Sequence, residues 1–240
     1  MDKADKKYTY EEFLEIIKTL RGENGCPWDK VQTHESLKPC MTEEAAELLA
    51  SIRIYEQTGN PENMIEELGD VLLQVVMHAE IASEEGLFTM ADVVDEVSRK
   101  MVRRHPHVFG TGSADTPEEV LTNWDEIKKE EKKDKEWVES PLREIPRELP
   151  ALTRAAKVLK KADKYYGQGS TYEQDVEALQ KSVDALRACA PEDYSKELEH
   201  IVADMLMRLS DIARIGKISH EQALTDRIED LIDKYEKPEC

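Results

Sequence analysis

The chain has 240 residues and is strongly acidic, with 52 Asp and Glu against 33 Lys and Arg and a formal net charge of −19. Such a charge repels nucleic-acid phosphates and anionic membranes, so neither is expected as a partner. The length allows one large or two small domains. No apolar stretch approaches the roughly 20 residues of a membrane span, and the first residues hold no apolar signal segment.

The cysteines do not follow the Cys-x-x-Cys spacing of zinc or redox sites. Free thiols in a reducing compartment are the simplest interpretation. Together with the lack of a signal segment, this pattern predicts a cytoplasmic protein. The cysteines are Cys26, Cys40, Cys189 and Cys240.

Helical periodicity dominates the first half of the chain, and no window alternates apolar and polar residues as a strand would. Helices are expected to begin after the capping residues Thr42 and Thr89 and to end at Gly86 and before Pro106. The residues around Pro106 are expected to form a loop. The sequence therefore predicts an all-α fold. The expected helices span about 10–21, 43–57, 62–84, 90–104 and 117–133, with a loop over 22–38.

The second half repeats the pattern of the first after a proline-containing stretch that reads as a linker. The segment 201–207 aligns with 67–73, but only Asp204 keeps its carboxylate, and Asp184 lies where the first acidic motif would recur. A repeat that has lost its site is the favoured interpretation, with two unrelated helical segments as the alternative. Helices are expected at about 151–165, 172–188, 193–215 and 220–235.

Two short acidic motifs carry the most chemical information: Glu-Glu-Ala-Ala-Glu at 43–47 and Glu-Glu-Leu-Gly-Asp at 66–70. Residues three apart share one face of a helix, so two packed helices would bring four carboxylates together. Unit charges about 4 Å apart repel by ~4 kcal/mol at an effective dielectric near 20, which favours a bound cation. Oxygen-only ligands suit Mg²⁺ or Mn²⁺. The expected metal ligands are Glu44, Glu47, Glu67 and Asp70.

Chance pairing on a solvated face is the competing interpretation, because acids are abundant in this chain. The helix over 64–82 is apolar nearly all round, however, and Glu44 shares a stripe with Leu48 and Ser51. Carboxylates on a buried face are unfavourable unless they are paired or bind metal. The metal site is therefore favoured.

Other enzyme classes find little support. A di-iron bundle needs Glu-x-x-His on two helices, and only Glu197-x-x-His200 occurs. No Walker A loop or Gly-x-Ser-x-Gly motif is present. The alternative that remains is a catalytically silent helical module that binds nucleotides or a partner protein, which fits the second half better than the first.

The Glu-x-x-Glu and Glu-x-x-Asp pair resembles the signature of the all-α nucleoside triphosphate pyrophosphohydrolases. The similarity is closer to the MazG-type members. Their four motifs occur in the same order and cover about residues 10–133. The motifs are Gly-Cys-Pro-Trp-Asp at 25–29 with Gln32-Thr33, the acidic pair, Arg-Arg-His-Pro-His-Val-Phe at 103–109, and Trp124-x-x-x-Lys128.

The resemblance implies hydrolysis of a nucleoside triphosphate at the α–β bond to nucleoside monophosphate and pyrophosphate, in nucleotide-pool clearance or house-cleaning. Mg²⁺ is the implied cofactor, Mn²⁺ can substitute, and a homodimer is implied. The domains expected are a MazG-like catalytic helical bundle over 1–135, a linker over 136–150, and a degenerate, non-catalytic MazG-like helical module over 151–240.

The residues themselves and the resemblance together suggest roles for individual side chains. Glu43 is the candidate for orienting or deprotonating the attacking water, with a solvated first-turn acid as the alternative. By resemblance, Lys100 and Arg104, which share a helix face, and Lys128 are the expected phosphate contacts, and Arg103 completes this basic cluster. A solvated basic face is the alternative interpretation. Trp124 and Trp28 either stack on the base or pack in the core. The positions matching Lys100 and Arg104 in the second half hold Asp230 and Lys234, which argues against a second active site.

Overall fold

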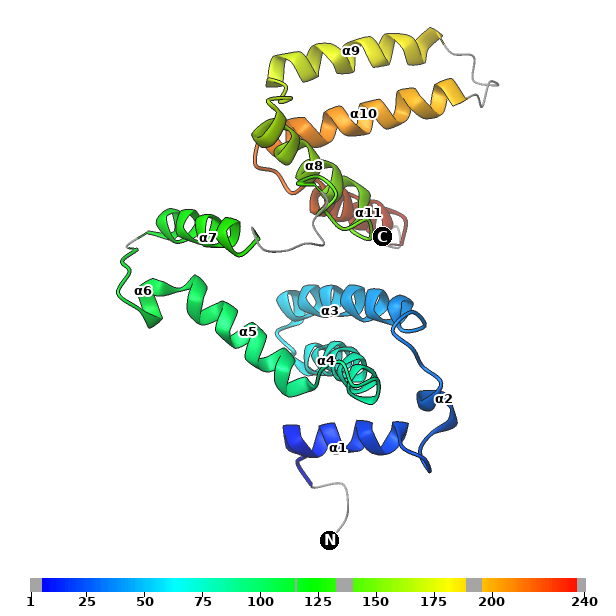
Figure 1. Cartoon of the computed structure of the whole chain (residues 1–240). Helices are drawn as coiled ribbons and strands as arrows, with labels where there is room; N and C mark the ends of the chain where they lie inside the picture. Colours follow the sequence, from blue (N-terminus) through cyan, green and yellow to red (C-terminus); the bar gives the residue numbers. More distant parts are fainter. Residues whose placement is uncertain (1–5, 115, 133–139, 189–195, 237–240) are drawn as a thin grey trace. The chain divides into compact units, whose positions relative to one another are not determined.

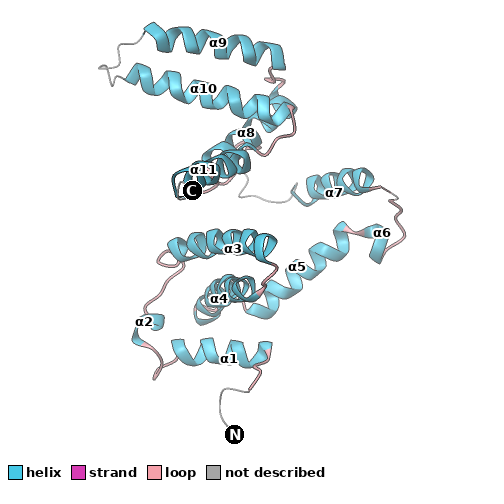
Figure 2. Cartoon of the chain, turned by 180° about the vertical axis from the view of Figure 1, so that it is seen from behind, coloured by secondary structure: helices cyan, strands magenta, loops and turns pink. Residues whose placement is uncertain are grey.

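The computed structural model describes residues 6–114, 116–132, 140–188 and 196–236. Every regular element among these residues is a helix, which confirms the all-α fold class (Figure 2). The chain divides into two compact units, Met1–Lys129 and Glu130–Cys240. Within the described ranges, no helix combines the length and the apolarity that a membrane crossing requires.

The first unit is organised around a helical hairpin. Helices α3 and α4 lie side by side, and α1 packs against the other side of α4 (Figure 1). The core forms between α1, α4 and the segment that leads into α3. It contains Ile17, Leu37, Val76, Met77 and Ile81. The helices of this unit are α1 (Tyr10–Arg21), α2 (Pro27–Lys30), α3 (Lys38–Thr58), α4 (Glu62–Glu84), α5 (Met90–Arg104), α6 (Pro106–Phe109) and α7 (Pro117–Lys132).

Local capping explains why several helix ends lie where the sequence predicts. The side chain of Thr89 accepts from the backbone N–H of Asp92, whose carboxylate accepts in return from the N–H of Thr89, so α5 begins with a capping box. Thr9 and Glu12 form the same arrangement at α1. Gly59 ends α3 with a φ of +71°, a left-handed conformation that glycine adopts without steric cost.

Two details differ from the sequence prediction, and each helix concerned has a proline in its first turn. Helix α3 begins at Lys38 rather than after Thr42, whose hydroxyl instead donates to the carbonyl of Lys38 at 3.2 Å inside the helix. The expected loops around Pro27 and Pro106 contain the short helices α2 and α6, each with its proline in the first turn. Proline ends one helix but also favours the first position of the next.

The second unit is built on another helical hairpin, in which α9 packs against α10, while α8 contacts α10 and α11. Residues of the stretch expected to be a linker pack here too, because Lys161 donates to the carbonyl of Pro141 at 2.8 Å and to Glu144 at 2.5 Å. The expected start of α10 near residue 193 lies outside the described residues. The helices are α8 (Ala151–Tyr166), α9 (Tyr172–Ala188), α10 (Lys196–Ile215) and α11 (His220–Glu236).

Candidate metal and nucleotide site

The α3–α4 hairpin brings three of the four expected metal ligands together. Glu44 on α3 and Glu67 and Asp70 on α4 each offer a carboxylate oxygen, and these oxygens lie within 4.8 Å of one another. All three side chains are at least partly buried. The i, i+3 spacing on α4 places Glu67 and Asp70 on the face that meets α3. We call these three residues the acidic cluster.

Glu47 and Glu43 lie beside the acidic cluster rather than in it. Both are exposed on α3. Glu47 is nevertheless close enough for its charge to act on the carboxyl of Glu44. Asn63, which the sequence analysis did not single out, donates to Glu67 Oε1 at 2.8 Å from one turn earlier on α4 and so orients that carboxylate.

Burial and the crowding of these acids raise the pKa of Glu44 above the usual value for a glutamate. Burial is the largest cause, followed by the negative charges of Asp70, Glu47 and Glu67. Each of these effects disfavours the ionised form when no cation is present. A divalent cation would reverse the balance, and the all-oxygen donor set fits Mg²⁺ or Mn²⁺.

Gln74 is a further polar residue beside the acidic cluster that sequence reasoning missed. It follows Asp70 by one helical turn and is only 6% exposed. A side-chain hydrogen bond from Gln74 lowers the pKa of Glu44, in opposition to the other effects. Its Oε1 atom is buried and has no hydrogen-bond partner in the structure. The spacing from Asp70 is the one signal that could have identified it.

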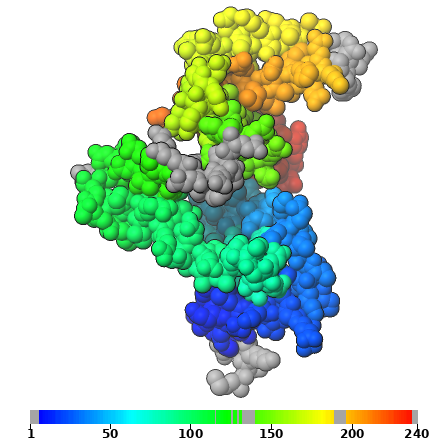
Figure 3. Space-filling model, viewed as in Figure 1, coloured from blue at the N-terminus to red at the C-terminus, as the bar shows by residue number. Residues whose placement is uncertain are grey.

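The basic and aromatic candidates gather at the end of α5 and on α7. The guanidinium carbon of Arg104 lies 5.2 Å from the centre of the Trp124 ring, and His105 meets the same ring edge-on at 5.0 Å. The space-filling view shows α7 against the end of α5 (Figure 3). Trp124 is therefore partly covered within its own unit. Lys100 is half-buried on α5, whereas Arg103 and Lys128 are exposed.

We call Lys100, Arg103, Arg104 and Lys128 the basic group. Within one chain, α5 does not lead this basic group toward α3. Met90, at the start of α5, packs against the core, and the helix then leads away from the α3–α4 hairpin (Figures 1 and 2). Trp28 on α2 is 59% exposed and so does not pack in the core of this unit.

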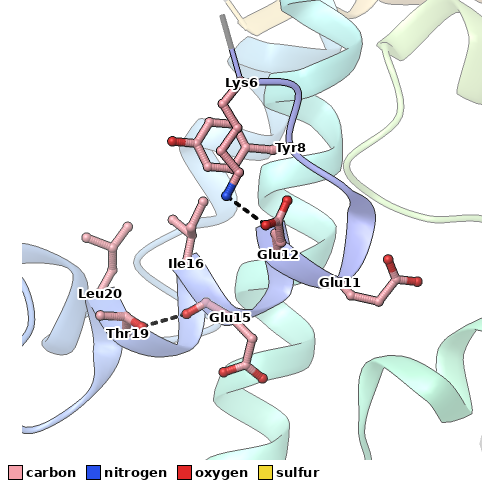
Figure 4. A pocket seen from close by; sticks show the side chains of 8 residues that line it. All are labelled: Lys6, Tyr8, Glu11, Glu12, Glu15, Ile16, Thr19 and Leu20. Carbon is pink, nitrogen blue, oxygen red and sulfur yellow. Dashed lines mark hydrogen bonds and ion pairs between the residues drawn. The ribbon is translucent and has the colours of Figure 1, made fainter. Parts of the chain in front are cut away.

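One surface hollow of about 480 Å³ lies elsewhere, on α1 (Figure 4). Lys6 and Tyr8, which precede α1, line one side of it, and Lys6 Nζ pairs with Glu12 Oε1 at 2.7 Å. None of the residues that line this hollow is an expected site residue.

Comparison with protein families gives a direct match over the acidic cluster. Residues 32–109 match the family described as MazG nucleotide pyrophosphohydrolase domain. This range includes α3, α4 and α5, and with them the three acids that the hairpin brings together.

Individual relatives extend the similarity over most of the chain. It is 45% identical over 227 residues to the uncharacterized protein YabN of Bacillus subtilis, and the match covers 92% of this chain but 45% of YabN, less than half of that protein's length. It is 36% identical over 230 residues to the nucleoside triphosphate pyrophosphohydrolase/pyrophosphatase MazG of Thermotoga maritima, covering 96% of this chain and 85% of that protein. It is 38% identical over 208 residues to the nucleoside triphosphate pyrophosphohydrolase of Escherichia coli K12, covering 85% and 77%. Since these matches extend over most of both proteins in the last two cases, the chain belongs to the MazG family of nucleoside triphosphate pyrophosphohydrolases.

Proposed function

We propose that the first unit hydrolyses a nucleoside triphosphate between its α- and β-phosphorus, releasing nucleoside monophosphate and pyrophosphate, with Mg²⁺ as the cofactor. The observation that carries this proposal is the convergence of Glu44, Glu67 and Asp70 within 4.8 Å. The raised pKa of Glu44 supports it, since the cluster is electrostatically incomplete without a cation.

The acidic cluster would hold the cation, with Glu47 as a fourth ligand from the next turn of α3. When bound, Mg²⁺ supplies charge neutralisation for the triphosphate and a water of lowered pKa. Asn63 holds the carboxylate of Glu67 in place through its hydrogen bond. Glu43, exposed at the edge of the site, is the proposed residue for orienting or deprotonating the attacking water.

The basic group is the proposed receptor for the triphosphate, which an acidic protein otherwise repels. Lys100 and Arg104 share one face of α5, and Lys128 follows Trp124 by one turn on α7. The guanidinium of Arg104 stacks over the Trp124 ring, so the two side chains together offer a flat, cationic surface for a nucleotide. Arg103 adds charge nearby, and Trp28, exposed on α2, is the proposed second stacking residue.

A homodimer would explain two features of the first unit. Apolar side chains follow the outer faces of the hairpin, among them Leu49 and Ile52 on α3 and Leu68 and Leu72 on α4, which are 38–70% exposed. Large apolar side chains left exposed on neighbouring helices favour an interaction site. In addition, α5 leads away from its own α3 (Figure 1), so a second copy could bring the basic group of one chain to the acidic cluster of the other.

We propose that the helical module over 151–240, in the second unit, is not catalytic. It would follow a catalytic domain over 1–135 and a linker over 136–150. Asp204 matches Asp70 of the acidic cluster and Asp184 matches Glu47 beside it, and both are exposed. Asp184 accepts from Gln180 at 3.3 Å and pairs with Arg187 at 3.6 Å. Because a metal site needs several oxygens in fixed geometry, interaction rather than catalysis suits this unit better.

The test is release of pyrophosphate and monophosphate from a panel of canonical, deoxy and modified nucleoside triphosphates by the full chain with Mg²⁺. We expect turnover by the wild-type chain that stops when excess EDTA is added. The variant Glu67→Gln should show no turnover. Glu56→Gln, which changes an exposed acid on α3 outside the acidic cluster, is the matched control and should leave the rate unchanged. Full activity with EDTA present, or release of orthophosphate in place of pyrophosphate, would overturn the proposal.

A further inference from the structure

Gln74 is a buried polar side chain of the first unit, and half of its hydrogen-bonding capacity is left unused. It is 6% exposed, and its Oε1 has no hydrogen-bond partner. A buried amide oxygen without a donor is unfavourable, and such groups in native proteins call for a specific explanation. A core position would be served better by Leu or Met, so packing alone does not account for a glutamine here.

The placement of Gln74 indicates what its two ends do. It lies one helical turn after Asp70 on the face of α4 that meets α3. Its side chain lies within hydrogen-bonding reach of the carboxylate of Glu44. Because an ionised carboxylate can only accept hydrogen bonds, the amide N–H is the donor. The reversed amide would set its oxygen against the oxygen of Glu44, which fixes the assignment. Donation through Nε2 leaves Oε1 as the open acceptor beside the acidic cluster.

We propose that Gln74 is a positioning residue of the metal site: its Nε2–H₂ orients the carboxylate of Glu44, and its Oε1 accepts a hydrogen bond from a water bound to the cation. This inference rests on the proposed function. The ligands of a metal ion are commonly held by such outer partners, whose removal weakens metal affinity by about 10–100-fold. Each half of the Gln74 amide would then have a partner once the cation and its water are bound.

The first experiment measures Mn²⁺ binding to the full chain by electron paramagnetic resonance, together with relaxation of water protons by the bound ion. Gln74→Met keeps the shape of the side chain and removes both hydrogen-bonding atoms. We expect a rise of about 10–100-fold in the Mn²⁺ dissociation constant and a changed water relaxation for the remaining bound ion. The unfolding temperature of the metal-free protein should hold or rise, since the unpaired oxygen is gone. Met77→Leu, a change at a buried core residue three positions further on, is the matched control and should leave Mn²⁺ binding unchanged.

The outcomes separate this inference from the proposed function. If the wild-type chain does not bind Mn²⁺, the metal site itself is wrong. If the wild-type chain binds Mn²⁺ and Gln74→Met binds it equally well with the same water relaxation, the site stands and the role of Gln74 is overturned.

A second measurement uses the unaltered chain and so does not depend on the folding of a variant. The side-chain amide protons of Gln74 should exchange slowly with solvent and shift in the nuclear magnetic resonance spectrum when Mg²⁺ is added. Gln57, an exposed glutamine on α3, is the internal control and should do neither. An amide signal of Gln74 that ignores Mg²⁺ at saturation, in a chain that binds it, overturns the proposed contacts.

Discussion

The Nδ1 atoms of His34 and His78 lie 2.7 Å apart, and the two rings are stacked with centroids at 5.0 Å and an interplanar angle of 7°. His34 belongs to the segment between α2 and α3, whereas His78 lies on α4. At this distance one nitrogen must donate and the other accept, because two protonated nitrogens would repel each other. The contact therefore joins the segment to α4 only while the pair holds a single proton between these atoms.

The first prediction is that acid weakens this contact. Burial, and then the charge of His34, lower the pKa of His78 below its usual 6.5. The unfolded chain thus binds more protons than the folded one between the lowered value and 6.5, so the free energy of unfolding decreases as pH falls through that window. Urea denaturation at several pH values should show a smaller loss in His78→Phe than in the wild type. His200→Phe, at an exposed histidine on α10, should follow the wild-type curve; equal curves for all three proteins would contradict the prediction.

A second prediction concerns Arg21, whose side chain is 4% exposed. Its Nε and Nη2 donate to the two carboxylate oxygens of Glu84 at 2.8 and 2.7 Å, and Nη1 donates to the carbonyls of Asp29 and Gln32. Arg21→Lys keeps the charge but loses the fork that fits a carboxylate. We expect a loss of about 2–3 kcal/mol in the free energy of unfolding.

The measurement is urea unfolding at neutral pH, with Arg53→Lys on α3 as the control at a more exposed arginine. A variant Arg21→Lys within about 0.5 kcal/mol of the wild type, the range of ordinary surface substitutions, would show that the ion pair does not stabilise the unit.

Local patterns allowed the helices and the acidic cluster to be predicted. The period of α4 and the capping residue Thr89 are local features that hold whatever the rest of the chain does. Glu67 and Asp70 share a face for the same reason, and only the pairing with Glu44 required α3 to pack against α4.

Features that depend on packing between distant segments could not be predicted. His34 and His78 are 44 residues apart, and nothing in either neighbourhood indicates a partner. Gln74 reads as an ordinary helical residue until its burial is known. The start of α3 was misplaced because a threonine that could cap a helix also fits inside one, where its hydroxyl bonds to the preceding turn.

The third prediction follows from the raised pKa of Glu44. In the folded metal-free chain, the carboxyl of Glu44 keeps its proton up to a higher pH than it does in the unfolded chain. The free energy of unfolding therefore decreases as pH rises through the raised pKa. Mg²⁺ should restore it, by about 2.7 kcal/mol at a hundredfold excess over the dissociation constant. Glu44→Gln should be insensitive both to this pH change and to Mg²⁺ in thermal unfolding at pH 5 and pH 8. A variant that gains as much from Mg²⁺ as the wild type would remove Glu44 from the site.

A fourth prediction separates substrate binding from the chemical step. Lys100→Ala and Lys128→Ala should raise KM about 10–100-fold with kcat largely kept, because each loses a charged contact made equally before and during the reaction. Trp124→Phe should be mild, whereas Trp124→Ala should raise KM by an amount that depends on the base. If Trp124→Ala instead lowers the unfolding temperature and affects every substrate alike, packing against Arg104 and His105 is its whole role.

The fifth prediction is that the second unit does not catalyse hydrolysis, and Arg208 gives the physical reason. The alignment of 201–207 with 67–73 places Arg208 where the first unit has Gln74. Its Nη1 lies 3.0 Å from Oδ1 of Asp175, which is 0% exposed. The guanidinium of Arg208 is therefore held in place between α9 and α10. A permanent positive charge at that position disfavours a divalent ion.

Three variants of the full chain test this difference between the units. Asp184→Asn combined with Asp204→Asn should leave kcat within a few-fold of the wild type, because neither acid holds the cation that the reaction needs. Arg208→Ala should lower the free energy of unfolding of the second unit by about 2–3 kcal/mol, since Asp175 is then buried without its partner, while hydrolysis by the first unit continues. Asp175→Asn with Arg208→Ala should recover part of that loss, because the unpaired charge is removed. Turnover that survives Glu67→Gln but is abolished by the double change at Asp184 and Asp204 would show that the second unit catalyses the reaction.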